Sequence, residues 1–228
     1  MNRQSPEYSA RVLDRIDRVA AAQWDACLAD ESGYVENPFV SHAFLDALEQ
    51  SRSVGRGTGW LPQHLVIEDG SGNLAAAAPL YVKSHSQGEY VFDHAWADAY
   101  ERAGGRYYPK LQVAAPFSPV PGPRLLVRAG PFAAQARAAL IAALLSAVEN
   151  SGMSSLHVTF ARRRMSPRWS RSASCAAPGC NTTGGTPATV ISTSFSGRST
   201  PASARRSARS APPPLRTAWN CVRGKGPN

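Results

Sequence analysis

The last 67 residues of the chain contain no acidic side chain. Residues 1–161 hold all 16 Asp and Glu residues and 13 of the 25 Lys and Arg residues, whereas residues 162–228 hold the other 12 basic residues. The formal charges of the two parts are therefore −3 and +12, and the net charge of +9 belongs to the C-terminal part. Because a nucleic-acid-binding domain carries its basic surface on the folded body, this distribution argues against such a role for residues 1–161.

Cysteine and long apolar segments are also scarce. Three of the four cysteines lie beyond residue 161, and Cys175 and Cys180 have neither a second ligand pair nor a histidine nearby, so no metal site is expected. Cys27 lies within an apolar helical pattern and is expected to be a small core residue. The longest apolar stretch, residues 138–148, is too short to span a bilayer, and the N-terminal residues lack the apolar core of a signal peptide. The body is therefore expected to be soluble and cytoplasmic.

Helix and strand patterns are mixed through residues 1–161. The sequence DGSG at residues 69–72 separates two apolar runs and predicts a β-hairpin. Ser41 is placed as the N-cap of a helix with one apolar face, and Gly152 follows the longest helical pattern at the position of a C-terminal stop. The expected strands are residues 11–16, 64–68, 74–82, 124–127 and 155–160, and the expected helices are residues 19–29, 42–50 and 133–149. This order predicts a body of the α/β or α+β class.

Aromatic side chains are concentrated in residues 89–126, which hold 7 of the 19 in the chain together with several ionisable groups. Aromatic walls with a few convergent polar groups are typical of a binding site for a small polar molecule. If residues 93–102 form a helix, His94 and Asp98 share one face, and His94 is the candidate catalytic base with Asp98 orienting its ring. Glu89 and Asp93 are alternative bases. A solvated helix face explains the same spacing without catalysis.

Further side chains near this segment are candidates for binding a substrate. Lys110 would offer a positive charge to a carbonyl or phosphate, and Tyr107 and Tyr108 would add hydroxyl groups, although packing at a sheet edge explains the tyrosines equally well. His85 lies in a polar loop, where a loop hydrogen bond is expected rather than metal ligation, and His157 is expected in the core. The substrate-binding candidates are Tyr90, Trp96, Tyr107, Tyr108, Lys110 and His85.

Residues 83–126, KSHSQGEYVFDHAWADAYERAGGRYYPKLQVAAPFSPVPGPRLL, resemble a bacterial family of N-acyltransferases. These are FemAB-like proteins related to the GNAT acyltransferases and described as peptidoglycan biosynthesis or recognition proteins. Residues 37–49, 59–69 and 154–160 are similar to the same family in the same order. The resemblance covers roughly residues 10–160. It implies that residues 1–161 form a GNAT-like domain, a mixed sheet flanked by helices.

The resemblance also implies an activity, the transfer of an acyl or aminoacyl group to an amine in peptidoglycan or cell-wall metabolism. The donor would be acyl-CoA or aminoacyl-tRNA, the acceptor a small-molecule or peptide amine, and no tightly bound cofactor is implied. GNAT enzymes bind the pyrophosphate of a thioester on backbone N–H groups at a helix N-terminus. The equivalent residues here, 128–131, contain one glycine, and Pro131 has no N–H. Family members resemble two tandem domains of this type, so the printed chain is expected to be a truncated, inactive transferase.

Residues 162–228 are a different kind of sequence. Ser, Arg, Ala, Pro, Thr and Gly make up 52 of these 67 residues, which leaves too little apolar surface to offset the chain entropy, so a disordered tail is expected. A shift of reading frame near residues 160–165 explains this composition better than a functional basic tail does. Read from the last base of the Cys180 codon, permitted codons for residues 180–195 encode QYHWRHPGYRDFDEF, which is similar to the continuation of the family into its second domain. We therefore expect residues 162–228 to be a frameshift product.

Two other functions fit parts of the sequence. A non-catalytic module could bind a cell-wall precursor or peptide through residues 85–126, with ligand binding and no turnover. A basic tail could bind nucleic acid, with a steep dependence on salt that is lost when residues 162–228 are deleted. Apart from that tail, the only nucleic acid expected as a partner is an aminoacyl-tRNA donor.

Overall fold

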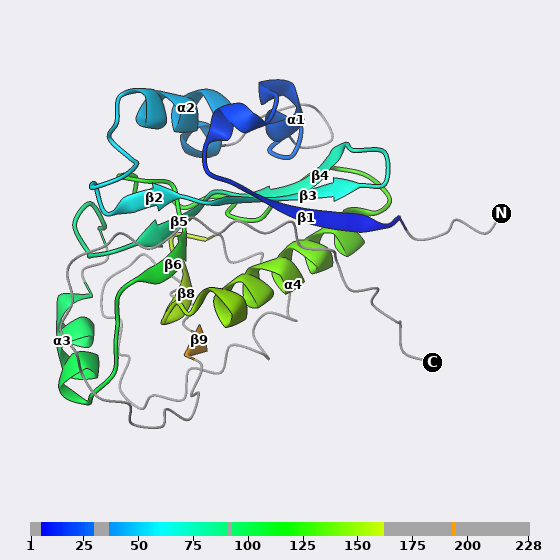
Figure 1. Ribbon diagram of the computed structural model, residues 1–228. Helices are drawn as coiled ribbons and strands as arrows, with labels where there is room; N and C mark the ends of the chain where they lie inside the picture. Colours follow the sequence, from blue (N-terminus) through cyan, green and yellow to red (C-terminus); the bar gives the residue numbers. More distant parts are fainter. Residues whose placement is uncertain (1–5, 30–36, 91–92, 162–192, 195–228) are drawn as a thin grey trace, which may run out of the picture.

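Two β-sheets share one continuous segment of chain, which crosses from the first sheet to the second at Pro79 (Figure 1). The computed structural model describes residues 6–29, 37–90, 93–161 and 193–194. β4 (Leu74–Ala78) belongs to the first sheet and β5 (Leu80–Lys83) to the second. The sequence predicted one strand over residues 74–82. Because Pro79 has no N–H to donate to a ladder, the strand is interrupted there.

The first sheet has the strand order β1-β3-β4-β7 and is antiparallel throughout. The predicted hairpin is confirmed, since Leu65 pairs with Ala78 and the Asp69 carboxylate accepts hydrogen bonds from the backbone N–H groups of Ser71 and Asn73. The other strands of this sheet are β1 (Tyr8–Leu13), β3 (His64–Asp69) and β7 (Leu126–Val127).

The second sheet has the order β2-β5-β6-β8-β9, and β6 pairs with β8 in parallel. Sequence analysis missed β2 and β6, because strands this short carry little periodic signal. Two residues of the tail, Thr193 and Ser194, pair with β8, whereas the rest of the predicted disordered tail lies outside the described residues. The strands are β2 (Trp60–Pro62), β6 (Lys110–Val113), β8 (Ser155–Val158) and β9 (Thr193–Ser194).

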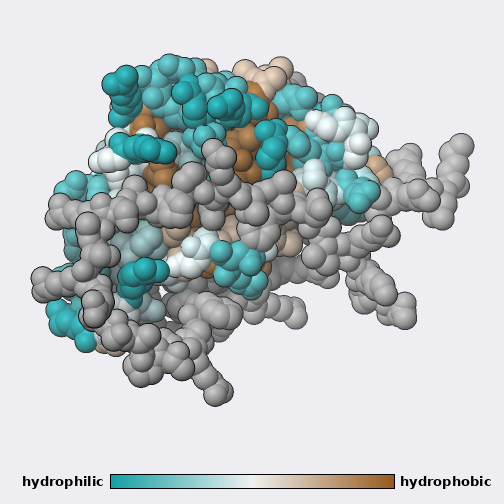
Figure 2. Space-filling model, viewed as in Figure 1, coloured by the Kyte–Doolittle hydropathy of each residue, from teal (hydrophilic) through white to brown (hydrophobic). Residues whose placement is uncertain are grey.

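Helices cover both faces of the first sheet (Figure 1). Leu65 and Ile67 pack with α4 on one face, whereas Val66 packs with the residues of α1 and α2 on the other, as the strand period of two requires. Over α1 and α2 the surface is mainly hydrophilic, with hydrophobic side chains visible between these helices and the sheet (Figure 2). The helical elements are η1 (Ile16–Arg18), α1 (Ala21–Asp25), η2 (Pro38–Val40), α2 (His42–Gln50), α3 (His94–Arg102) and α4 (Ala133–Ser151).

The helix ends follow the predicted signals. Ser41 Oγ accepts a hydrogen bond from the Phe44 backbone N–H at 3.3 Å, and Gly152 ends α4 with a left-handed φ of 67°. The helix predicted over residues 19–29 is shorter than expected, with Cys27 buried in the core just beyond it.

Two sheets flanked by helices confirm the predicted mixed α+β class. Within the described ranges, none of the helices combines the length and apolar character needed to cross a membrane.

Candidate functional site

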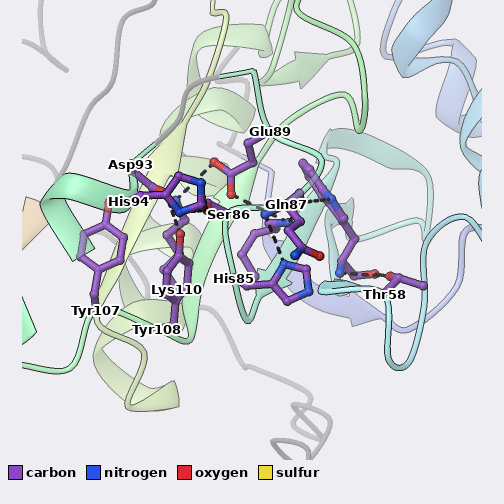
Figure 3. A network of polar contacts seen from close by, with 12 residues as sticks. Thr58, His85, Ser86, Gln87, Glu89, Asp93, His94, Tyr107, Tyr108 and Lys110 are labelled. Atoms are coloured by element: carbon purple, nitrogen blue, oxygen red, sulfur yellow. Dashed lines mark hydrogen bonds and ion pairs between the residues drawn. The ribbon is translucent and has the colours of Figure 1, made fainter. Parts of the chain in front are cut away.

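Four buried charged side chains meet where the loop after β5 and the start of α3 lie against β6. Glu89, Asp93 and Lys110 are labelled in Figure 3. Lys110 donates a hydrogen bond to Asp93 and lies 3.4 Å from Oε2 of Glu89. Lys83 lies 3.8 Å from Oε1 of Glu89 and donates to the Gln87 carbonyl oxygen at 3.0 Å. Each of the four charged residues is at most 7% exposed. Two positive and two negative charges therefore compensate one another, which burial of charge requires.

Asp93 accepts hydrogen bonds from three side chains of the β6 region. Besides Lys110, Tyr107 donates to Oδ2 at 2.9 Å and Tyr108 to Oδ1 at 2.7 Å. Burial raises the pKa of the Asp93 carboxyl, but the hydrogen bonds from Lys110, Tyr108 and Tyr107 act in the opposite direction, and the net pKa shift is downward. Asp93 is therefore held as an anion and is better suited to anchoring α3 than to accepting a proton.

The pKa of Glu89 is shifted in the opposite direction. Burial raises its pKa, and this effect outweighs the nearby positive charges of Lys110 and Lys83. With its amide nitrogen turned toward Glu89, Gln112 donates to the two carboxylate oxygens at 3.1 and 3.3 Å. A carboxylate with a raised pKa is a better proton acceptor than an ordinary one, so Glu89 is the stronger candidate base.

Lys83 completes the cluster from β5. Its Nζ lies 3.8 Å from the centre of the Trp60 ring, a cation–π contact. Burial lowers the pKa of Lys83 to about 8, although the Glu89 charge favours the ammonium form. This lysine is therefore close to losing its charge at mildly alkaline pH.

A small pocket opens beside Glu89. It is shallow, with a cavity volume of about 10 Å³, which is room for about one water molecule, and its wall includes Trp60, Glu89, Gln112, Phe117, Ser118 and Phe160. Phe117 and Phe160 have φ angles of 55° and 53°, a left-handed conformation that bulky residues rarely adopt. Strained backbone of this kind is found preferentially at ligand-binding and active sites, which supports a binding role for the pocket.

Gly88 allows two aromatic rings to form one wall of this pocket. Its φ is 77°, and a Cβ atom there would lie 2.6 Å from Cε1 of Phe117 and 2.8 Å from Nε1 of Trp60. The two rings lie 5.6 Å apart, and Trp60 Nε1 donates to the Gln87 carbonyl oxygen at 3.3 Å. The pocket therefore depends on a glycine both for its backbone angle and for the absence of a side chain.

A family model for FemAB-like proteins, described as peptidoglycan biosynthesis/recognition, matches residues 15–181. The chain belongs to the FemAB-like family. The match continues past residue 160, where the resemblance read from the sequence ends. Comparisons with curated proteins and with solved structures found no match.

Five of the predicted site residues come together in this FemAB-like chain. Glu89, Asp93, Tyr107, Tyr108 and Lys110 form one hydrogen-bonded and ion-paired cluster (Figure 3). The tyrosine hydroxyls thus donate to Asp93 near the start of β6, and their role in binding a substrate stays a prediction.

The other predicted site residues lie at the edge of this cluster. His94 Nδ1 lies 2.8 Å from Ser86 Oγ (Figure 3). Asp98, one turn along α3, is exposed. Trp96 is 62% exposed, and Tyr90, which is 58% exposed, lies in the wall of the pocket. The predicted loop hydrogen bond of His85 is confirmed, since its Nδ1 accepts from the Gln87 backbone N–H at 3.2 Å.

His157 is buried in β8, as predicted, and its ring lies 6.1 Å from that of Tyr107. Burial and the nearby Lys110 charge lower the pKa of His157 to about 4, so it is neutral. As for metals, the part of the chain that the structure describes has no group of three or more His, Cys, Asp or Glu residues placed to hold an ion.

Sequence analysis missed several residues of the FemAB-like site. Lys83 and Gln112 contact Glu89, Ser86 contacts His94, and Trp60 and Ser118 line the pocket. Lys83 and Gln112 did carry a signal, because a lysine and a glutamine within short apolar strands have to find polar partners when those strands are buried on both faces.

Proposed function

We propose that residues 6–161 form the acceptor-binding domain of a FemAB-like transferase, which moves an aminoacyl or acyl group to an amine of a peptidoglycan precursor. The observation that carries this proposal is Glu89, a buried carboxylate with a raised pKa in the wall of a pocket. An amine that attacks an ester has to lose a proton, and a basic group beside the pocket can accept it.

In the proposed reaction the amine nitrogen attacks the carbonyl carbon of the donor ester. A C–N bond forms, the ester C–O bond breaks, and the leaving group departs as an alcohol after it takes up the proton that Glu89 accepted from the amine. Glu89 accepts the proton of the amine, while Lys110 and Gln112 hold the Glu89 carboxylate in place. Asp93 fixes Lys110, so it acts on Glu89 through that lysine.

Aminoacyl-tRNA is the donor that this proposal favours over acyl-CoA. A CoA pyrophosphate would need free backbone N–H groups before α4. The Arg128 N–H donates to the Ala75 carbonyl oxygen at 3.0 Å, the Ala133 N–H donates to the Gly130 carbonyl oxygen at 3.2 Å, and Pro131 has none. Because these backbone N–H groups are already hydrogen-bonded or missing, few donors remain to bind a pyrophosphate at the N-terminus of α4.

The donor is tested with the protein encoded by the gene in its corrected reading frame, incubated with an amine-bearing muropeptide and either radiolabelled aminoacyl-tRNA or labelled acetyl-CoA. We expect label to reach the muropeptide from the tRNA alone. Transfer from acetyl-CoA would contradict the choice of donor, and transfer from neither, with intact muropeptide binding, would favour a recognition module. The second function has one observation in its favour, because both Glu89 oxygens already face protein donors.

We propose further that residues 162–228 are a frameshift product and that the printed chain by itself is inactive. The complete absence of acidic residues after Glu149 supports this proposal. Resequencing the gene across the codons for residues 155–228 tests it. A missing or extra base, followed by an open frame for a second domain, is the expected result. An unchanged reading frame would contradict it and would favour the hypothesis that the basic tail binds nucleic acid.

A further inference from the structure

Lysine is the rarest charged residue of the chain, and its positions are uneven. The chain has three lysines, Lys83, Lys110 and Lys225, so the other 22 of its 25 basic residues are arginines. Lys83 and Lys110 are the only lysines in the part of the chain that the structure describes, and both are fully buried in the charged cluster. Arginine keeps its charge in proteins, whereas a buried lysine can lose its proton. The body therefore places its only two lysines beside the candidate base.

Lys83 and Lys110 lie directly opposite each other on neighbouring strands. They are Cα partners in the antiparallel ladder of β5 and β6. Like charges at such positions repel each other and destabilise a sheet. The Glu89 carboxylate lies beside both ammonium groups, with Lys83 Nζ 3.8 Å from Oε1 and Lys110 Nζ 3.4 Å from Oε2. Glu89 therefore offsets a repulsion that the register of the two strands imposes.

Lys83 is held in this place by contacts that do not involve Glu89. Its Nζ donates to the Gln87 carbonyl oxygen at 3.0 Å and lies 3.8 Å from the centre of the Trp60 ring. Trp60 is the Cα partner of Lys83 on its other neighbouring strand, β2. An opposite charge within about 4–6 Å favours the ionised form of a carboxyl group. The ammonium group is therefore fixed where it favours the carboxylate form of Glu89.

The two lysines differ in their carboxylate partners. Lys110 also pairs with Asp93. Among the residues that the structure describes, Lys83 has no ion-pair partner except Glu89. The other titratable groups that interact with this pair are Lys110 and Asp93 of the cluster and His85 of the loop after β5. Removing the Lys83 charge should therefore act mainly on Glu89.

We propose that Lys83 is a positioning residue for the base, which holds the Glu89 carboxylate ionised and in place beside β5. This inference rests on the proposed function in taking Glu89 as the base. Lys83 is fully buried and does not line the pocket, so it acts through Glu89 and does not touch the amine. Without this cation the buried carboxyl would keep its proton to higher pH and would accept a proton from the amine less often.

NMR titration of the 228-residue chain tests the inference without an enzyme assay. The Glu89 carboxyl carbon is observed in protein made with ¹³C-labelled glutamate and is assigned by its loss in E89Q. Burial raises the pKa of Glu89 and the Lys83 charge lowers it, so Glu89 should titrate at higher pH in K83M than in wild type. A change that only loosened the fold would expose Glu89 and move its titration to lower pH. An unchanged or lower midpoint in K83M would overturn the inference.

Two further variants separate the charge of Lys83 from its bulk. K83R keeps a positive charge, so Glu89 should titrate closer to its wild-type midpoint than it does in K83M. R18M removes an exposed charge that pairs with Asp14 on the surface and should leave the Glu89 titration unchanged. Circular dichroism confirms that each variant is folded. A shift in R18M as large as that in K83M would overturn the assignment to Lys83.

The coupling has to be reciprocal, which allows a second test that does not depend on the folding of K83M. E89Q replaces the carboxylate by a neutral amide of nearly the same shape. The Glu89 charge favours the ammonium form of Lys83, whose pKa is about 8, so Lys83 should titrate at lower pH in E89Q. With three lysines in the chain, the lysine side-chain signals are few enough to resolve. An unchanged Lys83 midpoint in E89Q would overturn the inference.

Transfer assays on the protein encoded by the corrected gene separate this inference from the proposed function. On the acidic side of the pH profile, K83M should lower kcat/KM by about tenfold, and its rate should approach that of wild type as pH rises. Shifted titrations without any transfer would support the role of Lys83 and contradict the proposed function. Transfer with unshifted titrations would do the reverse.

Discussion

The Lys110 ammonium donates to the carboxylate of Asp93, the residue immediately before α3. Aspartate at such a position usually accepts from the helix N-terminus, yet the Asp93 side chain makes no capping hydrogen bond. Its carboxylate is bonded to β6 side chains, namely Lys110, Tyr107 and Tyr108. The start of α3 is therefore fixed to the second sheet by a polar contact.

Replacing this carboxylate should destabilise the fold. D93N removes the charge that compensates Lys110, and we expect the free energy of unfolding to fall by about 2–4 kcal/mol. D98N alters an exposed carboxylate on the same helix and should change stability by less than about 0.5 kcal/mol. Urea unfolding of the two variants measures both values. Equal stabilities would show that the Asp93 contact has no structural role.

Lys83 should make stability depend on alkaline pH. Burial lowers the pKa of Lys83 to about 8, so the unfolded chain, with an ordinary lysine pKa near 10.5, binds more protons between these values. Wild type should therefore gain stability relative to K83M as pH rises from about 8 to 10.5, by about 2–3 kcal/mol at most.

The measurement is urea unfolding at several pH values in this range. R18M serves as the control, because it removes an exposed positive charge that pairs with Asp14 on the surface. A constant difference between wild type and K83M across the range would show that the Lys83 pKa is not lowered.

Gly88 and Gly72 form a matched pair for the geometry of the pocket. Their φ angles are 77° and 79°, but a Cβ atom on Gly72 meets no atom within 4 Å, whereas one on Gly88 meets Phe117 and Trp60. Both alanine substitutions carry the same backbone strain, about 1 kcal/mol. G88A should lose a further 1–3 kcal/mol or so through overpacking, measured as thermal unfolding. Equal losses for G88A and G72A would mean that the rings move aside freely.

The site segment could be located from the sequence because its signal is local. The aromatic and ionisable residues of segment 89–126 are close in sequence, and Glu89, Asp93 and Lys110 do meet in the structure. The hairpin at residues 69–72 and the ends of α2 and α4 were predicted for the same reason, since turn and cap signals act within a few residues.

The pocket could not be predicted in this way. Its wall joins Trp60 of β2, the turn at Phe117 and Ser118, and Phe160 after β8, which only the sheet order brings together. The left-handed angles of Phe117 and Phe160 have no sequence signature, because bulky residues rarely adopt them. The Glu89 pKa also depends on its partners, so spacing alone did not separate Glu89 from Asp93 as a base.

The role of Glu89 is tested most directly by aminoacyl transfer to a muropeptide, measured for the protein encoded by the resequenced gene and for two variants. E89Q should lower kcat/KM by about 10²–10⁴-fold, the range for loss of a general base, and should remove the rise in rate that accompanies deprotonation of a carboxyl with a raised pKa. E101Q, which alters an exposed glutamate of α3, should stay within about twofold of wild type. An E89Q enzyme with the wild-type rate and pH profile would contradict the assignment of Glu89 as the base.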